Sequence, residues 1–250
     1  MTAPLFLVPA GGLDGLEPGG HVELTGPEAR HAATVMRLGP SDPILVADGR
    51  GARVHGEVLQ AQSERVLVVV RARDDEPVEG PDVVLVQALS KGDRDLLAAQ
   101  TAVELGVGGV VPWEAERSIV RWKGAKAERA RQKWADALAT AAKQARRGIV
   151  PRLDPTVSGT GVAALAAEDV CVLVLHEQAE QSLSTLPEQS WAQARRIALV
   201  VGPEGGVSEA ELMALTASGA LPVRLGPHVL RASTAGPTGL AVMQHRLGRW

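Results

Sequence analysis

Four largely apolar runs in the later part of the chain place the strongest constraint on its fold. They are Val83–Leu89, Val107–Pro112, Val170–Leu175 and Ile197–Val201. Runs that lack polar alternation are typical of parallel strands buried on both faces. Because helical segments separate them, we predict an α/β domain built around a mostly parallel sheet.

Local signals give the limits of the helices in this domain. Asp93 can cap a helix that ends near Leu105 before Gly106, and Ser208 with Glu211 forms a capping box for a helix to about Ser218. The other expected elements are a helix over Lys126–Arg147 with the apolar stripe Trp134, Leu138, Ala141 and Ala145, a short strand at Val223–Leu225, and a last helix over about Thr234–Leu247.

The first part of the chain has a different pattern. Short β-prone runs separated by Gly, Pro and Asp occur at Val22–Leu24, Ile44–Ala47, Val54–Leu59 and Val66–Arg71. One helix-like segment, Pro27–Leu38, interrupts them. A small β-barrel or sandwich fits this pattern, and the acidic, proline-rich segment Asp74–Pro81 is typical of a linker. We therefore predict two domains, residues 1–74 and 75–250.

Composition excludes several classes of protein. No apolar run approaches the length of about 18 residues that a membrane span needs, and the N-terminus lacks the pattern of a signal peptide. The single cysteine, Cys171, lies in an apolar run, so a buried and inert thiol is expected. Without a Cys/His cluster we expect no metal site, and we expect a cytoplasmic protein.

Charge is unevenly distributed along the chain, although the net charge is only −3. Between Arg117 and Arg152 there are eleven Lys and Arg residues against two acids, Glu128 and Asp136. Such a basic stretch can bind the phosphates of a nucleic acid, or it can be the solvated face of a helix. Charge alone favours neither interpretation.

Three turns follow predicted strands, where ligands bind in an open parallel sheet. They are His176-Glu177, Gly202–Gly206 and Gly226–His228. Glycine in such turns lets a ligand approach the backbone closely, so the three together predict a shared pocket. Neither a Walker A loop, nor the glycine fingerprint of a dinucleotide fold, nor a clustered Ser/His/Asp set is present.

Two of these turns belong to longer motifs. Val200–Ser208, with the order Val-Val-Gly-Pro-Glu-Gly-Gly-Val-Ser, is followed by Leu225–Ala235, with the order Leu-Gly-Pro-His-Val-Leu-Arg-Ala-Ser-Thr-Ala. As a pair they closely resemble the ribosomal RNA small subunit methyltransferase E family, of the SPOUT class of knotted methyltransferases. Further matches cover nearly the whole chain in the same order: Arg30-His31 through Arg37-Leu38, Glu104–Val107, Glu116–Ser118 and Leu175–Glu177.

The resemblance implies a fold and an activity that composition does not. The expected fold class is α/β, with a small N-terminal PUA-like β-barrel that binds RNA and a C-terminal SPOUT-type α/β domain that contains a trefoil knot. The expected activity is S-adenosylmethionine-dependent methylation of uridine N3 in 16S ribosomal RNA, by a homodimer acting on the RNA or on the small ribosomal subunit. The alternatives are a knotted methyltransferase acting on transfer RNA, or an RNA-binding assembly factor that has lost catalysis.

The resemblance also suggests roles for individual residues. Arg231 is the candidate cation for the anion that forms when uridine N3 loses its proton, and Glu204 is a second candidate catalytic residue, with an orienting role favoured over that of a general base. The residues expected to bind the cofactor are Leu175, His176, Glu177, Gly202, Pro203, Gly205, Gly206, Leu225, Gly226 and Leu230. His228 is expected to be a surface residue.

Basic residues and one histidine are the candidates for RNA binding. They are His31, Arg37, Arg117, Arg121, Lys123, Arg146 and Arg147, and for His31 and Arg37 internal packing is a slightly favoured alternative. Two positions depart from the usual pattern of the family. Ser233 stands where Glu is usual, and Lys143–Arg147 replaces the usual Glu-Gln-Ser/Cys-Gly-Arg run.

Overall fold

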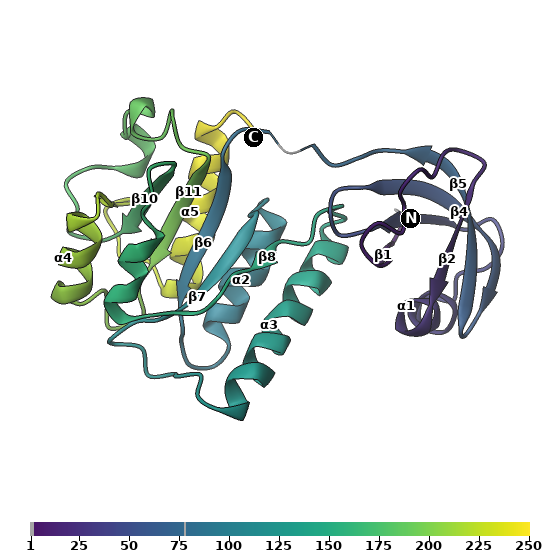
Figure 1. The fold of residues 1–250 in the computed structure, drawn as a ribbon, viewed down its shortest axis with the longest axis horizontal. Helices are drawn as coiled ribbons and strands as arrows, with labels where there is room; N and C mark the ends of the chain where they lie inside the picture. The colour runs from purple at the N-terminus through teal and green to yellow at the C-terminus, as the bar shows by residue number, and fades with distance from the viewer. Residues whose placement is uncertain (1–2, 78) are drawn as a thin grey trace. The chain divides into compact units, whose positions relative to one another are not determined.

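A computed structural model describes residues 3–77 and 79–250, and it divides into two compact units (Figure 1). The first unit comprises Met1–Val78 together with Ala139–Val150, and the second comprises Glu79–Leu138 and Pro151–Trp250. The chain therefore leaves the second unit within a helix and returns to it at Pro151. The division of domains after residue 74 stays a prediction.

The first unit is built on one curled, five-stranded sheet. Its strands are β1 (Leu5–Leu7), β2 (His21–Thr25), β3 (Pro43–Ala47), β4 (Arg53–Gln62) and β5 (Arg65–Arg73), in the order β1-β3-β4-β5-β2. Only β1 and β3 run parallel. Because β1 and β2 form its two edges, the sheet is an open half-barrel. Along β2, Val22 and Leu24 are buried between exposed neighbours, as expected for a strand with one face in the core.

The predicted helix at Pro27–Leu38 is present in two parts. An α-helix, α1 (Gly26–Arg30), has proline in its first turn and continues into a π-helical turn over His31–Val35. Ala29 and Ala32 are fully buried in the core of the first unit. Arg37 adopts a left-handed conformation, with φ of 57°, just beyond the end of the helix.

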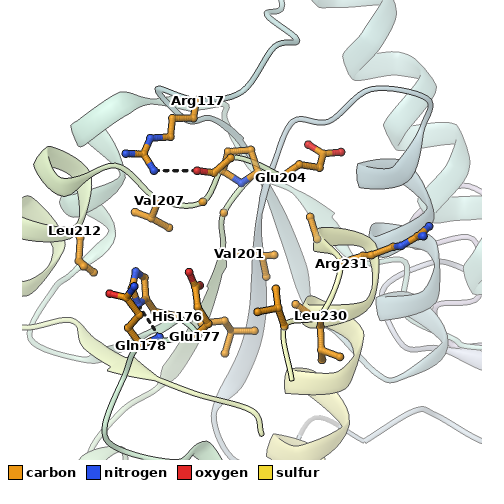
Figure 2. Close-up of a pocket in the computed structure, with 18 of the residues that line it drawn as sticks. Arg117, His176, Glu177, Gln178, Val201, Glu204, Val207, Leu212, Leu230 and Arg231 are labelled. Carbon is orange, nitrogen blue, oxygen red and sulfur yellow. Dashed lines mark hydrogen bonds between the residues drawn. The ribbon is translucent and has the colours of Figure 1, made fainter. Parts of the chain in front are cut away.

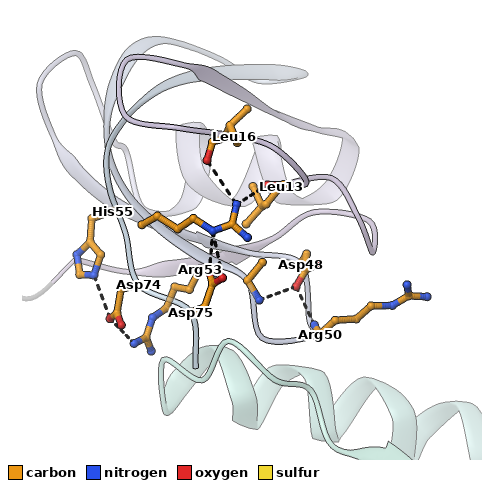
Figure 3. A network of polar contacts seen from close by, with 10 residues as sticks. Leu13, Leu16, Asp48, Arg50, Arg53, His55, Asp74 and Asp75 are labelled. Atoms are coloured by element: carbon orange, nitrogen blue, oxygen red, sulfur yellow. Dashed lines mark hydrogen bonds and ion pairs between the residues drawn. The ribbon is translucent and has the colours of Figure 1, made fainter. Parts of the chain in front are cut away.

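Both ends of the predicted linker Asp74–Pro81 are bound rather than free. On the first unit, the Arg53 guanidinium lies 2.5 Å from the carboxylate of Asp74, and Arg73 lies 2.9 Å from that of Asp75 (Figure 3). On the second unit, Arg249 donates hydrogen bonds to the backbone carbonyls of Glu79 and Pro81. Asp74 and Asp75 therefore form ion pairs, which the composition of the segment does not predict.

The second unit confirms the predicted parallel sheet. Its strands are β6 (Asp82–Ala88), β7 (Gly109–Glu114), β8 (Arg152–Leu153), β9 (Val157–Ser158), β10 (Val170–Leu175), β11 (Arg196–Val201) and β12 (Leu221–Val223). They lie in the order β12-β10-β11-β6-β7-β8, with β9 also paired to β7, and all the pairs are parallel. The apolar runs in β6, β10 and β11 are buried almost throughout, as predicted.

Two local predictions about this sheet have different outcomes. The strand expected at Val223–Leu225 ends at Val223, because β12 pairs with Leu173–Leu175 and the next residue, Arg224, turns to bond with Gln181. Cys171 is buried in β10 as predicted, and this burial raises the pKa of its thiol to about 11.

Four α-helices and three 3₁₀ helices follow β6 in the described residues, and one of the α-helices, α3, runs from the second unit into the first. The α-helices are α2 (Arg94–Glu104), α3 (Ala125–Gln144), α4 (Glu209–Ala217) and α5 (Ala232–Arg246), and the 3₁₀ helices are Gly159–Leu165, Leu183–Thr185 and Glu188–Ser190. Helices α2 and α5 pack together on one face of the sheet, while α4 packs with Gly159–Leu165 (Figure 1). None of the helices in the described residues is long and apolar enough to cross a membrane.

The predicted caps of α2 and α4 also have different outcomes. The capping box of α4 is present in full, since Ser208 and Glu211 each accept the other's backbone N–H. The prediction that the Asp93 side chain caps α2 is wrong. Asp93 stands at the N-cap position with a left-handed φ of 56°, and its side chain forms no capping bond because it pairs with Lys133.

Candidate functional site

A cavity of about 820 Å³ lies at the carboxyl ends of β10 and β11 in the second unit (Figure 2). Three chain segments supply most of its wall: His176–Gln178 after β10, Gly202–Val207 after β11, and Val229–Ala232 at the start of α5. Arg94 from the start of α2 and Arg117 from the turn after β7 complete one side. Two of the three predicted turns, His176-Glu177 and Gly202–Gly206, therefore meet at this cavity, whereas the third, Gly226–His228, lies outside its lining.

Local backbone requirements explain the glycines of the loop after β11. Gly206 has a φ of 76°, a conformation that side chains disfavour, and its N–H bonds to the carbonyl of Pro203 at 2.8 Å. At Gly202 an added Cβ would lie 2.9 Å from a methyl group of Val207. The loop therefore folds back on itself tightly, which leaves its backbone groups accessible in the cavity wall.

The charged side chains of the cavity wall are balanced in sign. Three arginines, Arg94, Arg117 and Arg231, stand against three carboxylates, Glu177, Glu204 and Glu209. Arg94 lies 3.4 Å from Glu204. A wall that mixes both signs of charge with apolar side chains suits a ligand that carries charged groups on an otherwise uncharged body.

Two of the arginines make different contacts with their surroundings. The Arg117 guanidinium donates to the carbonyl of Gly205 at 2.9 Å. Arg231, the N-cap residue of α5, is exposed, and its guanidinium has no hydrogen bond or ion pair to any described residue. Figure 2 shows the Arg231 side chain directed away from His176 and Gln178. One arginine is thus fixed to the loop, while the other remains available to a substrate.

Comparison with known proteins assigns both units to known domain families. An RNA methyltransferase domain matches residues 78–244, and an RNA methyltransferase PUA domain matches residues 24–71. The ribosomal RNA small subunit methyltransferase E of Mycobacterium bovis is 38% identical over 255 residues, which cover 100% of this chain and 94% of the relative. This chain belongs to the ribosomal RNA small subunit methyltransferase E family.

Two further relatives support the assignment. The enzyme of the same name from Bacillus subtilis is 30% identical, with 89% of each chain covered. Among solved structures, the family member from Neisseria gonorrhoeae bound to S-adenosyl methionine has a TM-score of 0.85 and 27% identity, covering 98% of both chains. The predicted family and fold class, a PUA-like domain followed by a SPOUT-type α/β domain, are therefore confirmed. The β-barrel expected for the PUA-like domain is an open half-barrel, and the knot stays a prediction.

Most of the residues predicted to bind the cofactor lie together in the cavity wall. These are Leu175, His176, Glu177, Gly202, Pro203, Gly205, Gly206 and Leu230, and both candidate catalytic residues, Glu204 and Arg231, join them. Leu225 and Gly226 are outside the lining, and Gly226 is exposed with open space around it. Their contact with a cofactor stays a prediction. His228 is exposed, as predicted.

The candidate RNA-binding residues of the first unit differ in their surroundings. His31 packs edge-to-face against Phe6, with ring centroids 5.7 Å apart, which favours the packing alternative for this residue. Arg37 and Arg146 both have left-handed φ values, of 57° and 56°. Arg147 is mostly buried, with 12% of its side chain exposed, and lies 3.2 Å from Glu76.

The remaining candidates for RNA binding belong to the segment between β7 and α3. Arg117 lines the cavity and contacts Gly205, a position that the sequence did not suggest. Arg121 donates to the carbonyl of Glu116 at 2.9 Å. Lys123 is exposed and has no hydrogen bond or ion pair within residues 3–77 and 79–250.

Several residues of the cavity wall were missed by reasoning from the sequence. They are Arg94, Gln178, Val201, Val207, Glu209, Leu212, Val229, Ala232 and Ala235. Five of these lie inside the motifs Val200–Ser208 and Leu225–Ala235, and Gln178 and Glu209 directly follow a predicted residue or motif. Arg94 has no such signal, because it stands at the start of α2, which follows β6 rather than β10 or β11.

Proposed function

We propose that this chain transfers a methyl group from S-adenosylmethionine to N3 of a uridine in the 16S RNA of the small ribosomal subunit. The main support is the cavity lined by His176–Gln178, Gly202–Val207 and Val229–Ala232, in a chain that belongs to this family. The relative from Neisseria gonorrhoeae, which covers 98% of the chain, is bound to S-adenosyl methionine. Methyl donation from the cofactor's sulfonium is the chemistry that this group supplies when bound.

The residues present fit this cofactor. A volume of about 820 Å³ lies within the usual range of about 300–1,000 Å³ for small-molecule sites. Val207, Leu212 and Leu230 supply apolar surface for an adenine ring, and backbone groups of Gly202–Gly206 supply hydrogen bonds. Glu177 and Arg117 place opposite charges in the wall, which suits the ammonium and carboxylate groups of the methionine part.

The chain's own groups must bring uridine N3 into line with the methyl group and favour loss of its proton. Positioning and exclusion of water account for much of such catalysis. The negative charge left by the proton spreads onto the neighbouring carbonyl oxygens. The Arg231 guanidinium, which has no partner among the described residues, is the cation suited to stabilise it. Glu204 faces Arg94, which supports an orienting role rather than that of a general base.

The RNA must present its target base outside a helix, because an enzyme cannot reach N3 of a stacked and paired base. Exposed cations near the start of α3, such as Arg121 and Lys123, suit the flanking phosphates. The PUA-like unit, with Arg37 exposed, is the second surface proposed for RNA. We also propose that the protein acts in the cytoplasm as a homodimer, as the family resemblance implies.

Methyl incorporation from labelled S-adenosylmethionine tests the proposal. Unmodified small subunits, free 16S RNA and transfer RNA are offered separately, and the labelled base is identified by mass spectrometry. We expect label at uridine N3 in the ribosomal substrates and none in transfer RNA. Equal labelling of transfer RNA contradicts the substrate, and absence of labelling despite cofactor binding supports an assembly factor instead. Sedimentation at several protein concentrations tests the dimer.

A further inference from the structure

A buried carboxylate, Glu211 on the first turn of α4, makes one hydrogen bond more than its helix requires. Its side chain is fully buried. Oε2 accepts the backbone N–H of Ser208 at 3.1 Å, which completes the capping box. Oε1 accepts the backbone N–H of Glu116 at 2.6 Å, from the turn after β7 and 95 residues earlier in the chain. The second bond therefore serves the turn rather than the helix.

The next residue of that turn holds the loop after β11. Arg117 extends across Gly205, where an added Cβ would lie only 3.2 Å from the Cβ of Arg117. Its guanidinium then donates to the Gly205 carbonyl at 2.9 Å (Figure 2). Glu211, Glu116 and Arg117 thus form a continuous path of bonds from the start of α4 to the middle of the loop.

Among the described residues, few other hydrogen bonds hold this tightly folded loop. The backbone hydrogen bond within Gly202–Gly206 is that from the Gly206 N–H to the Pro203 carbonyl. The contact of Glu204 with Arg94, at 3.4 Å, is long and lies between exposed side chains. A loop that must present its backbone to a ligand in one geometry needs support from surrounding hydrogen bonds.

We propose that Glu211 is a positioning residue for the cofactor loop and acts through the Glu116 N–H and Arg117. The inference rests on the cofactor-binding part of the proposed function. No ion pair of Glu211 occurs in the described part of the chain, so the partners of its buried carboxyl group are backbone N–H donors. A glutamine of the same shape accepts one of these N–H groups and turns an NH₂ group toward the other, which weakens the path.

Calorimetric titration with S-adenosylhomocysteine tests the inference in a double-mutant cycle. Arg117→Met keeps the aliphatic stem over Gly205 but removes the donor, and we expect the affinity to fall about tenfold. Glu211→Gln should weaken binding by a similar factor. Because both act through the same contact, the double variant should bind about as well as the weaker single variant. Arg117→Lys, which keeps one donor, should recover part of the affinity.

Thermal unfolding without ligand separates positioning from general stability. Ser208→Ala is the matched control, because it removes the other side chain of the capping box and leaves the bond from Glu116 to Glu211 in place. We expect Ser208→Ala to lower the Tm and leave the affinity for S-adenosylhomocysteine unchanged, whereas Glu211→Gln lowers both.

Three results overturn the inference. The first is an affinity for S-adenosylhomocysteine that is unchanged in Glu211→Gln although the Tm is lowered. The second is a double variant in which the two losses of affinity multiply. The third is wild-type affinity in Arg117→Met. If Glu211→Gln does not fold, the affinity of Arg117→Met for S-adenosylhomocysteine decides the matter, because Arg117 is exposed and its substitution leaves the core intact. A wild-type protein that does not bind S-adenosylhomocysteine contradicts the proposed cofactor instead, so the two failures are distinguishable.

Discussion

The Lys133 ammonium lies 2.7 Å from both carboxylate oxygens of Asp93, which joins α3 to the loop that precedes α2. One cation of the basic stretch Arg117–Arg152 is thereby neutralised inside the second unit. Arg152 is likewise neutralised by Asp82, at 2.5 Å. In the first unit, Lys143 pairs with Glu28 at 2.7 Å. Much of the charge excess read from the sequence is therefore used within the fold, and less of it is available to RNA.

Lysines with and without an internal partner should differ in their effect on RNA binding. Lys123 is exposed and unpaired in the described residues, whereas Lys133 is paired. We expect Lys123→Ala to reduce the slope of log affinity against log salt concentration by about 0.7–0.9, the loss of one phosphate contact. Lys133→Ala should change the slope much less. Fluorescence anisotropy with a small-subunit RNA fragment measures both, and an equal reduction in the two variants refutes this assignment.

Removal of the Arg231 guanidinium should separate cofactor binding from turnover. Its side chain has no internal partner in the described chain and is directed away from His176 (Figure 2). For Arg231→Ala we expect the affinity for S-adenosylhomocysteine to stay within about twofold. We expect kcat to fall about 100-fold, as when one donor to a developing anion is removed. Calorimetry and methyl incorporation measure the two quantities, and a collapse of cofactor affinity contradicts the role proposed for Arg231.

A side chain at Gly205 should disturb the cofactor loop, while one at Gly226 should not. In Gly205→Val the added atoms meet the side chain of Arg117, whose Cβ lies 3.2 Å from the Cβ position. We expect the affinity for S-adenosylhomocysteine to fall at least about tenfold. Gly226 has no atom within 4 Å of its Cβ position, so in Gly226→Val the affinity falls only if the cofactor itself contacts this residue. Equal losses in both variants indicate that the loop carrying Gly226 also contacts the cofactor.

The features that sequence alone predicts well are those set by neighbouring residues. The capping box needs only Ser208 and Glu211, three residues apart, and it is present in full. The strand Val170–Leu175 has the bounds expected, because a buried parallel strand is apolar on both faces. The loops after β10 and β11 were found because each follows such a strand, and ligand sites lie at these ends of a parallel sheet.

Features that depend on the order of strands were not predictable in this way. Arg94 and Arg117 follow β6 and β7, and they meet the loop after β11 only because β6 lies beside β11 in the sheet. No local pattern specifies that order. Asp93 was expected to cap α2, but its left-handed backbone and its pairing with Lys133 are set by contacts distant in sequence. Arg117 was taken for an RNA contact because it lies in the basic stretch, and its bond to Gly205, 88 residues away, has no local signal in the sequence.

The pH dependence of stability should reveal the buried carboxyl of Asp95. Asp95 lies on α2 and accepts the N–H of Ser90 at 2.9 Å, and its burial raises the pKa of the carboxyl above the ordinary value of 3.8. Its contribution to stability is therefore fully present below pH 3.8 and is lost as the pH rises through the raised pKa. We expect the Tm of the wild type, relative to Asp95→Asn, to fall as the pH rises from about 3.5 to 7.

Asp74 provides a control of opposite sign for this experiment. Its hydrogen bond with the Arg53 guanidinium, and the charge of that group, lower the pKa of the exposed Asp74 carboxyl (Figure 3). Its contribution is present above pH 3.8 and is lost as the pH falls through the lowered pKa. The Tm of the wild type relative to Asp74→Asn should therefore fall, by a smaller amount, toward low pH. Differential scanning calorimetry of the three proteins measures both trends, and parallel curves for wild type and Asp95→Asn contradict a raised pKa at Asp95.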